Sequence, residues 1–266
     1  MTSRFVRRMR AAVFAASRGR RTYLKARVGT AVYLVSPEDR GPSAKVYLNR
    51  KRPEFVVLAR AVQLVVSRGT FVDVGANIGT TTIPALLDHG FARAVACEPG
   101  ALAAESLRRS LAANGLAGRA TVVEAAVTDA EGTLRLRMPT ADSGILEVGA
   151  PDGEEIEVVA VTLDGLAARG VYDSADVGMV WVDAQGHEGH VLAGATRLLE
   201  RGVPLVVALR PKKLRRGGGL ERYVELLEGR YERVVDLRAA EPVEEIGALR
   251  RFIDENRKTD LLLLAG

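Results

Sequence analysis

Short apolar runs alternate with amphipathic segments over most of the chain. From residue 70 onward the runs have the length of buried strands, and the segments between them repeat apolar side chains at helical spacing. Fully apolar strands that alternate with helices are typical of a mainly parallel sheet covered by helices on both faces, so the pattern predicts an α/β fold. The predicted strands span 71–74, 94–97, 120–127, 133–137, 156–162, 177–182, 203–209, 233–237 and 260–264, and the predicted helices span 54–67, 78–89, 101–114, 190–200 and 220–227.

The first 52 residues follow a different pattern and predict an extension that precedes a main domain over 53–266. Arginine alternates with apolar side chains over 1–21 at the spacing of one helical face. Two β-rich pieces, 30–35 and 45–48, flank a turn that contains proline and glycine. We therefore expect a basic helical arm followed by a β-hairpin.

The net charge of +5 is concentrated in the arm. Residues 1–37 hold nine of the 38 basic residues and no acidic one, so the rest of the chain has 29 basic and 33 acidic residues and a net charge of −4. A nucleic-acid-binding domain would carry basic side chains on its folded face, and we therefore expect no nucleic-acid partner. For residues 1–27 we expect packing against the chain's own domain, with weak contact to a membrane surface as the alternative.

The composition excludes several classes of protein. Hydrophobic residues make up 47% and charged residues 27% of the chain, which is typical of a globular protein. No run reaches the roughly 18–20 apolar residues of a membrane-spanning helix, and the run over 11–16 is too short for a secretory signal. The single cysteine, Cys97, excludes an intramolecular disulfide and indicates a reducing, cytoplasmic compartment. With three histidines and one cysteine, a Cys/His zinc site is not expected.

A glycine-containing turn follows the predicted strand 71–74. Asp73 lies at the end of the strand, and Gly75 and Gly79 permit a tight turn before the next helix. The spacing differs from the G-x-G-x-x-G turn that binds the diphosphate of NAD, and a carboxylate here would repel a diphosphate. It suits S-adenosylmethionine, which carries a sulfonium and an ammonium group on an adenosine without phosphate. We expect this cofactor to be bound by Asp73, Gly75, Ala76, Asn77 and Gly79.

Two further acids follow later strands. Glu98 lies nineteen residues beyond Gly79, after strand 94–97, where an acid can accept hydrogen bonds from both ribose hydroxyls. Asp129 follows strand 120–127, and we expect it near the adenine edge, with a turn position as the alternative. Glu98 and Asp129 therefore complete the expected cofactor-binding residues.

A second group of polar residues, 183–188, follows strand 177–182 and faces the same crevice. Methyl transfer requires an acceptor oxygen in line with the S–CH₃ bond and removal of its proton. Histidine, with an unperturbed pKa of about 6.5, suits proton removal at neutral pH. We expect His187 to be the general base, with Asp183 or Glu188 orienting it or contacting the acceptor, and helix capping by the two acids as the alternative. A divalent metal would need a third acid, which the segment lacks, so no metal is expected.

These motifs together resemble the FkbM family of S-adenosylmethionine-dependent methyltransferases. The resemblance implies a class I, Rossmann-like fold with a doubly wound, mainly parallel seven-stranded sheet and a reversed last strand. It also implies O-methylation of a hydroxyl on a small molecule, often a sugar or a secondary metabolite. One departure is Ala208, near the end of the fifth strand, where the family often has a glutamate. The similarity covers the chain from Pro53 onward and rests on 71–79, Glu98-Pro99, Asn114, 126–132, 161–164, 182–188 and 191–195.

Two other functions are alternatives. The chain could be a non-catalytic, membrane-associated scaffold that binds a ligand and docks through the arginine arm, although the intact glycine turn and Glu98 argue against an inactive site. An NAD-linked oxidoreductase is disfavoured by Asp73 and by the glycine spacing. The acceptor, the choice between oxygen and nitrogen as the methylated atom, and the oligomeric state are not determined by the sequence.

Overall fold

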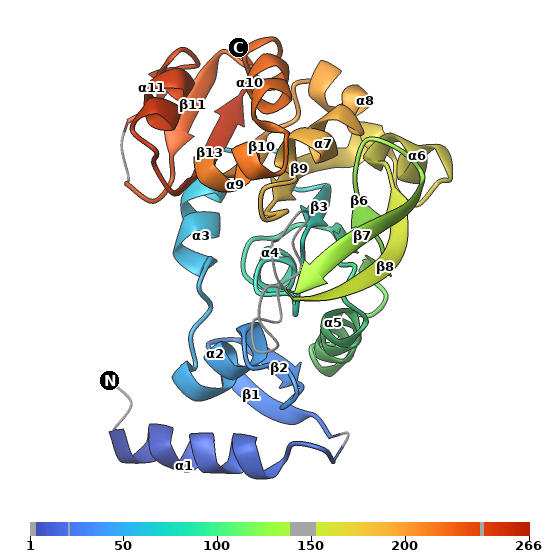
Figure 1. Ribbon diagram of the computed structural model, residues 1–266, viewed down its shortest axis with the longest axis vertical. Helices are drawn as coiled ribbons and strands as arrows, with labels where there is room; N and C mark the ends of the chain where they lie inside the picture. The colour runs from blue at the N-terminus through green and yellow to red at the C-terminus, as the bar shows by residue number, and fades with distance from the viewer. Residues whose placement is uncertain (1–3, 21, 139–152, 240–241) are drawn as a thin grey trace.

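The computed structural model describes residues 4–20, 22–138, 153–239 and 242–266. The strands of its main sheet are β3 (Thr70–Val74), β4 (Arg93–Cys97), β5 (Ala120–Val123), β9 (Val177–Val182), β10 (Leu205–Leu209), β11 (Arg233–Asp236), β12 (Glu244–Glu245) and β13 (Thr259–Leu264). They lie in the order β12-β11-β13-β10-β9-β3-β4-β5 (Figure 1). Neighbours from β10 to β5 are parallel, whereas β13 is antiparallel to both β10 and β11. This confirms the doubly wound sheet with a reversed last strand, to which β12 adds a short edge.

Helices cover both faces of the sheet, and each face has its own apolar core. β3 illustrates the division, because Phe71 belongs to one core and Val72 and Val74 to the other, as the alternation of side chains along a strand requires. The first core includes α3 (Phe55–Gln63), α4 (Thr82–Leu87) and α5 (Ala101–Ala113). The second includes α6 (Leu163–Ala168), α7 (Glu188–Ala193), α8 (Thr196–Glu200), α9 (Pro211–Arg216), α10 (Leu220–Glu228) and α11 (Ala248–Asp254), and the short 3₁₀ helix η1 (Ser174–Asp176) precedes β9.

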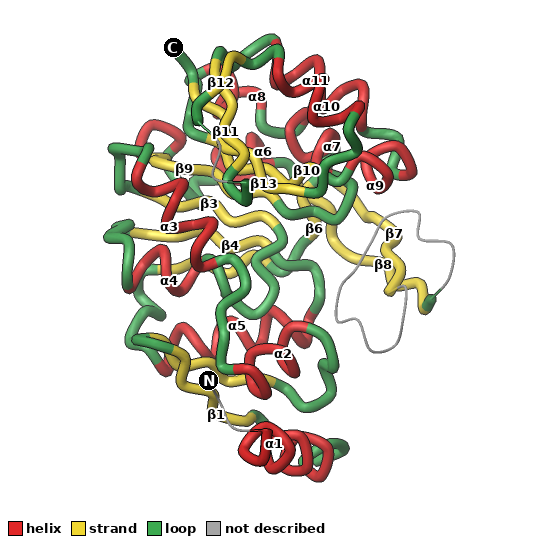
Figure 2. The backbone as a smooth tube through the Cα atoms, turned by 90° about the vertical axis from the view of Figure 1, so that its left-hand side faces the viewer, coloured by secondary structure: helices red, strands yellow, loops and turns green. Residues whose placement is uncertain are grey.

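The predicted strand 120–127 is divided between two sheets. After β5 the backbone N–H of Ala125 bonds to the carbonyl of Val123 (3.0 Å), and this tight turn separates β5 from β6 (Ala126–Val127). β6 joins a second sheet of three strands with β7 (Gly132–Met138) and β8 (Glu154–Val161), in the order β6-β8-β7. β7 and β8 are antiparallel, which confirms the additional strand pair. Figure 2 shows this pair projecting from the side of the main sheet.

The N-terminal hairpin pairs residues other than those expected. Its strands are β1 (Leu24–Val28) and β2 (Ala31–Val35), which are antiparallel. The predicted strand over 45–48 is wrong, because this segment belongs to α2 (Pro42–Asn49). The hairpin is therefore formed by the end of the basic arm and the first of the two predicted pieces.

The start of α2 explains this correction. The carboxylate of Asp39 accepts hydrogen bonds from the backbone N–H groups of Gly41 (2.8 Å) and Ser43 (2.8 Å). Pro42 is the first residue of the helix. The N–H groups of the first turn have no acceptor within a helix, so the missing N–H of proline removes no helical hydrogen bond. These local interactions override the β propensity of Val46 and Tyr47, which are buried side chains of the helix.

The extension is attached to the main domain through Asn114 at the end of α5. Asn114 accepts a hydrogen bond from the N–H of Val32 (2.9 Å) and donates to its carbonyl (2.6 Å), so a side chain pairs with the free edge of β2. The helix of the arm is α1 (Arg4–Ala16), which packs on α2 through the rings of Phe14 and Tyr47. Among the described residues, no helix is both long and apolar enough to cross a membrane.

Several helices are shorter than predicted or divided, and α3 ends at Gln63 where the prediction extended to residue 67. The segment 78–89 contributes only α4, because Gly79 has a φ of +87°, which a right-handed helix cannot contain. The segment 190–200 forms parts of two helices, α7 and α8, because the backbone leaves helical geometry at Ala195 (φ −126°, ψ 31°).

Replacement of Gly79 tests how closely α5 packs on the turn after β3. A Cβ at this position would lie 2.5 Å from Cδ1 of Leu107, and a left-handed φ adds strain. Gly90 has a φ of +75° but no atom within 4 Å of a built Cβ, so it is a control for the strain alone. We expect Gly79→Ala to lower the free energy of unfolding by about 2–4 kcal/mol and Gly90→Ala by about 1 kcal/mol, measured by urea unfolding. Equal losses would contradict the packing argument.

Candidate cofactor-binding and active site

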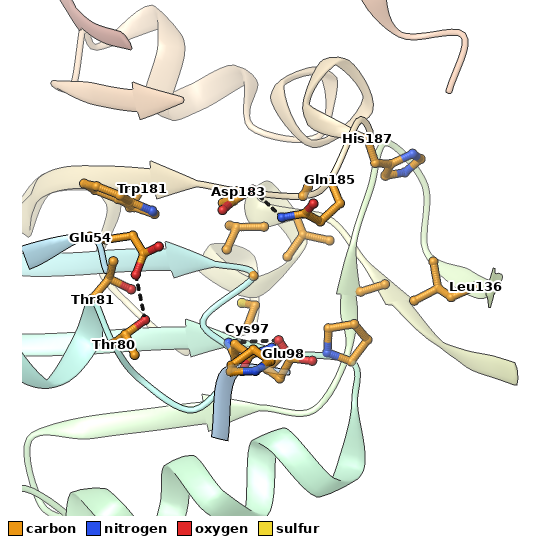
Figure 3. Close-up of a pocket in the computed structure, with 18 of the residues that line it drawn as sticks. Glu54, Thr80, Thr81, Cys97, Glu98, Leu136, Trp181, Asp183, Gln185 and His187 are labelled. Atoms are coloured by element: carbon orange, nitrogen blue, oxygen red, sulfur yellow. Dashed lines mark hydrogen bonds between the residues drawn. The ribbon is translucent and has the colours of Figure 1, made fainter. Parts of the chain in front are cut away.

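A cavity of about 300 Å³ lies at the carboxyl ends of β3, β4 and β9. Ligands bind at this edge of open parallel sheets, and small-molecule sites have volumes of about 300–1,000 Å³. In the view of Figure 3, Asp183 and Gln185 lie on one wall and Glu98 lies on the opposite wall. The structure therefore brings the first turn and the segment after β9 to one site, as the sequence predicts.

The turn after β3 is held against both neighbouring strands. The N–H groups of Gly75 and Ala76 donate to the carbonyl of Cys97 at 3.0 and 3.1 Å. A Cβ on Gly75, whose φ is +81°, would lie 2.2 Å from the carbonyl oxygen of Asp183. Only glycine permits this approach, and it fixes the distance between the two walls. Gly75 and Asn77 line the cavity, whereas Ala76 and Gly79 do not, so direct contact of these two with a cofactor stays a prediction.

Glu98 lies on the cavity wall in the position expected from the sequence. Its Oε2 accepts a hydrogen bond from the N–H of Asn77 (2.9 Å) and its Oε1 accepts one from the N–H of Gly100 (2.8 Å). Each oxygen has a second lone pair, so the orientation is fixed while acceptor capacity remains. Burial raises the pKa of Glu98 to about 7, although the two N–H groups lower it. A carboxylate held in this way can accept hydrogen bonds from both hydroxyls of a ribose.

Asp73 supports the turn and does not line the cavity. It is fully buried, and its Oδ2 accepts hydrogen bonds from the hydroxyls of Thr81 (2.6 Å) and Thr82 (2.5 Å). Burial raises the pKa of Asp73 to about 6. Its Oδ1 is buried without a hydrogen-bond partner among the described residues. Direct contact between Asp73 and a cofactor is therefore still a prediction.

Asp183 is the acid that the end of β9 presents to the cavity. Its Oδ1 accepts a hydrogen bond from Nε2 of Gln185 (2.8 Å), and Oε1 of Gln185 accepts one from Nζ of Lys213 (2.7 Å). Burial raises the pKa of Asp183, while the charges of Arg210 and Lys213 lower it. The Asp183 carboxylate is thus positioned by Gln185 from its own loop, which is held in turn by Lys213 from α9.

Glu188 has a structural position. It is fully buried, and its carboxylate accepts hydrogen bonds from the N–H groups of Ala184 (3.1 Å) and Gly186 (3.0 Å). Burial raises the pKa of Glu188 to about 7, and the charge of Asp183 adds to this effect. Neither Glu188 nor Asp183 bonds to the imidazole of His187 in the described structure, and contact of either acid with the acceptor stays a prediction. Both N–H groups belong to residues that precede α7, so Glu188 closes the turn before the helix and does not cap the helix.

His187 is oriented by Thr128, a residue that the sequence did not suggest. Its Nε2 lies 2.8 Å from the Thr128 hydroxyl, and that hydroxyl donates to Oδ1 of Asp129 (3.1 Å). Nε2 therefore carries the proton, which leaves the lone pair on Nδ1, an atom that is buried and has no partner among the described residues. Burial lowers the pKa of His187 to about 4, and the stacked ring of His190, 4.4 Å away, contributes. His187 lines the cavity as a neutral ring.

Asp129 lies outside the cavity lining. Its Oδ2 accepts a hydrogen bond from Arg222 (2.5 Å) and lies 3.2 Å from Nδ1 of His190. Burial would raise the pKa of Asp129, but hydrogen bonds from His190 and Arg222 lower it to about 2. Its contact with an adenine stays a prediction, whereas its present partners connect β6 to α7 and α10.

The sequence did not suggest the contribution of the extension to the site. Pro42, Lys45 and Val46 from α2 line the cavity, and Glu54 adds a carboxylate just before α3. Oε2 of Glu54 accepts a hydrogen bond from the Thr80 hydroxyl (3.1 Å). Burial raises the pKa of Glu54, and the charge of Asp183 adds to it. No motif surrounds Glu54, so only its position after Pro53 could have indicated it.

The two ends of the cavity differ in chemistry. In the view of Figure 3, Glu54 and Trp181 lie toward one end, and His187 and Leu136 lie toward the other. Toward the first end lie the half-buried carboxylates of Glu54 and Asp183. The second end is lined by apolar side chains from β6 and β7 and their surroundings, namely Ala125, Ala126, Val127, Leu134 and Leu136. Glu98 lies between them.

Over the parts of the chain that the structure describes, no group of three or more His, Cys, Asp or Glu residues could hold a metal ion.

This sheet order, with a nucleoside-sized cavity at the carboxyl ends of its strands, defines a class I methyltransferase fold. A family model described as the methyltransferase FkbM domain matches residues 73–258, which is more than half of the chain. The chain therefore belongs to the FkbM methyltransferase family, in agreement with the cofactor S-adenosylmethionine expected from the sequence. No curated protein matches the chain.

Several solved structures are similar to this one. The methyltransferase FkbM from Methylobacillus flagellatus KT is 17% identical with a TM-score of 0.45, covering 74% of this chain and 43% of that chain. The precorrin-6y C5,15-methyltransferase from Geobacter metallireducens GS-15 is 15% identical with a TM-score of 0.47, covering 90% and 100%. The O-methyltransferase from Bacillus cereus, in complex with SAH, is 13% identical with a TM-score of 0.43, covering 100% and 93%. The chain thus spans less than half the length of the M. flagellatus protein.

The buried, neutral His187 predicts a pH dependence of stability. Its pKa of about 4 lies below the value of about 6.5 expected in the unfolded chain, so the unfolded state binds a proton that the folded state excludes. Stabilisation by the neutral ring is present above pH ~6.5 and is lost as the pH falls toward ~4. We expect the difference in free energy of unfolding between the wild type and His187→Gln to shrink by about 1–2 kcal/mol between pH ~7 and ~5. Urea unfolding at the two pH values measures it, and a difference independent of pH would contradict the burial of the neutral ring.

Proposed function

We propose that this chain is a methyltransferase that binds S-adenosylmethionine in the cavity and methylates a hydroxyl of a small molecule. The observation that carries the proposal is the order of chemistry along the cavity: carboxylates at one end, Glu98 in the middle and apolar side chains at the other end. S-adenosylmethionine has the matching order of a cationic methionine end, a ribose and an adenine. A dinucleotide would place a diphosphate near these acids, which disfavours the NAD-linked alternative.

The fit is supported by the residues on each wall. Glu98 has oxygens that are fixed by two backbone N–H groups and still able to accept the ribose hydroxyls. Glu54 and Asp183 have pKa values raised by burial, and a cationic group between them would stabilise their ionised forms. The neutral ring of His187 and the side chain of Leu136 provide a surface against which an adenine can pack.

The cofactor supplies a methyl group on a sulfonium, which is already an activated leaving group. The bound cofactor would supply this methyl group to the acceptor oxygen, and the protein would have to provide a base for the hydroxyl proton. We assign this role to Asp183, because it lies at the end of the cavity that suits the sulfonium and its raised pKa strengthens it as a base. Gln185 and Lys213 hold its carboxylate in position. Oxygen is favoured over nitrogen as the methylated atom. A hydroxyl must lose its proton to a base such as Asp183, whereas a neutral amine can attack without one.

His187 is the alternative base that the sequence suggested. In its present tautomer only Nδ1 could accept a proton, and the low pKa makes it a weak base. The non-catalytic scaffold is disfavoured because the cavity, Glu98 and the acids are all in place. A cytoplasmic location belongs to the same proposal and rests on Cys97, which is a free, buried cysteine.

Cofactor affinity tests the role of Glu98. Glu98→Gln retains the shape of the side chain but removes its charge, which weakens the hydrogen bonds that it accepts from the two ribose hydroxyls. We therefore expect the Kd for S-adenosylmethionine, measured by calorimetry, to rise by about 10–100-fold. Glu124→Gln, at an exposed glutamate paired with Arg108, is the matched control. Unchanged affinity in Glu98→Gln would remove this residue from the ribose site. NAD in place of S-adenosylmethionine should give no heat of binding.

The pH dependence of this affinity follows from the raised pKa of Glu98. In the free protein the carboxyl group becomes ionised as the pH passes about 7, and the ionised form is the one that accepts both ribose hydroxyls. We expect affinity to increase between pH ~6 and ~8 and proton release to accompany binding, measured by calorimetry in buffers of different ionisation enthalpy. Glu98→Gln should remove this dependence; a dependence that persists would point to another group.

Turnover distinguishes the two candidate bases. We expect Asp183→Asn to lower kcat by at least about 100-fold and His187→Gln by less than about 10-fold, with S-adenosylhomocysteine release measured over a panel of small hydroxylated acceptors. Cofactor affinity, measured in parallel, separates loss of binding from loss of proton transfer. A larger effect in His187→Gln would assign the base to histidine.

A further inference from the structure

The inner face of α1 attaches this helix to the extension. Phe14 is its buried residue, with a ring centroid 5.6 Å from that of Tyr47 on α2. The Arg7 guanidinium donates to Oδ1 of Asn49 (3.1 Å), and that of Arg10 donates to the carbonyl of Leu48 (3.3 Å). These contacts fix one face of the helix against α2 and determine which face is turned outward.

The outward face of α1 is apolar. Phe5, Met9 and Val13 follow one another at four-residue spacing, and their exposed fractions are 69%, 55% and 46%. Residues spaced by four lie along one line of an α-helix, so these side chains form a strip parallel to its axis. Val6 widens the strip and is 37% exposed. Figures 1 and 2 show α1 at one extreme end of the molecule, away from the main sheet.

Basic side chains border the apolar strip. Arg4 and Arg8 are exposed on α1, and Arg18 and Arg20 are exposed in the turn that follows it. The first acidic residue of the chain is Glu38, whose carboxylate accepts a hydrogen bond from the N–H of Gly19 (2.6 Å). The outer end of the molecule is therefore both apolar and cationic, while the remainder of the chain is net acidic.

We propose that α1 docks this protein on an anionic lipid surface, with Phe5, Met9 and Val13 inserted at the level of the headgroups. A helix that lies flat on a bilayer buries such a strip to one depth, and arginines at its border can bond to lipid phosphates. A second copy of α1 is a poorer partner, because it would bring two arginine-rich surfaces together. The strip lies on a single outer helix and not in a groove, which suits a flat partner.

Docking would involve the same extension that forms part of the cavity. α2 carries α1 on one side and contributes Lys45 and Val46 to the cavity lining. When α1 is bound to a surface, the protein is therefore held next to α2, which lines one part of the cavity. The turn after β3 and Glu98, which line another part, belong to the main domain. No residue of α1 lines the cavity, so surface binding and cofactor binding can be measured separately.

Vesicle sedimentation of the full chain tests the docking. With vesicles containing about 30% phosphatidylserine, we expect binding at least about tenfold stronger than to phosphatidylcholine alone, and a strong decrease at ~0.5 M salt. Met9→Ser combined with Val13→Ser should weaken binding by about tenfold or more, and so should Arg4→Gln combined with Arg8→Gln. Val66→Ser is the matched control, because Val66 is 96% exposed and lies outside α1.

The outcomes separate the possible partners. The affinity for S-adenosylmethionine should be equal in all these variants, which shows that they fold and that the site is unaffected. Failure to bind phosphatidylserine vesicles at low salt, or binding that the α1 variants leave unchanged, overturns the proposal. A dimer in light scattering that dissociates in Met9→Ser with Val13→Ser overturns it in favour of a second copy.

Discussion

The close approach of Gly75 to the end of β9 determines the geometry of the site. The carbonyl of Asp183 occupies the space that a side chain would need, and the N–H groups of Gly75 and Ala76 bond to the carbonyl at the end of β4. One short turn thus contacts both strands that flank β3. Because these contacts are made by backbone atoms, they place the backbone of Glu98 and Asp183 on facing walls, and side-chain hydrogen bonds then orient the Asp183 carboxylate. The cavity is a consequence of this constraint.

The carboxylates in and beside the cavity differ in how far their loss of hydration is compensated by hydrogen bonds. Glu188 bonds to N–H groups of its own turn, and Asp73 bonds to two threonine hydroxyls, so their burial is offset locally. Glu54 and Asp183 have fewer partners and raised pKa values. Burial of ionisable groups without full compensation costs stability, and it is typical of sites where a ligand supplies the missing charge. A cationic methionine moiety is such a ligand.

The extension links the site to the outer surface of the molecule. Asn114 joins the hairpin to α5, and α2 extends from the hairpin to the cavity and carries α1 on its other side. Part of the cavity lining, Pro42, Lys45 and Val46, therefore comes from a segment outside the sheet. In a fold whose sheet is shared by many enzymes, such added segments give an acceptor pocket its individual shape.

Local patterns in the sequence determined the strands β3, β4, β9, β10, β11 and β13, the glycine turn and the positions of Glu98 and Asp183, because buried strands and tight turns each have a short-range signature. The sequence also indicated a hairpin but placed its second strand over 45–48, where bonds from Asp39 start α2 instead. Only the tertiary structure decided that Thr128 orients His187, that Glu188 closes a turn and that Glu54 faces the cavity. These relations join residues brought together by folding, and no local propensity or spacing records which side chains will share a cavity.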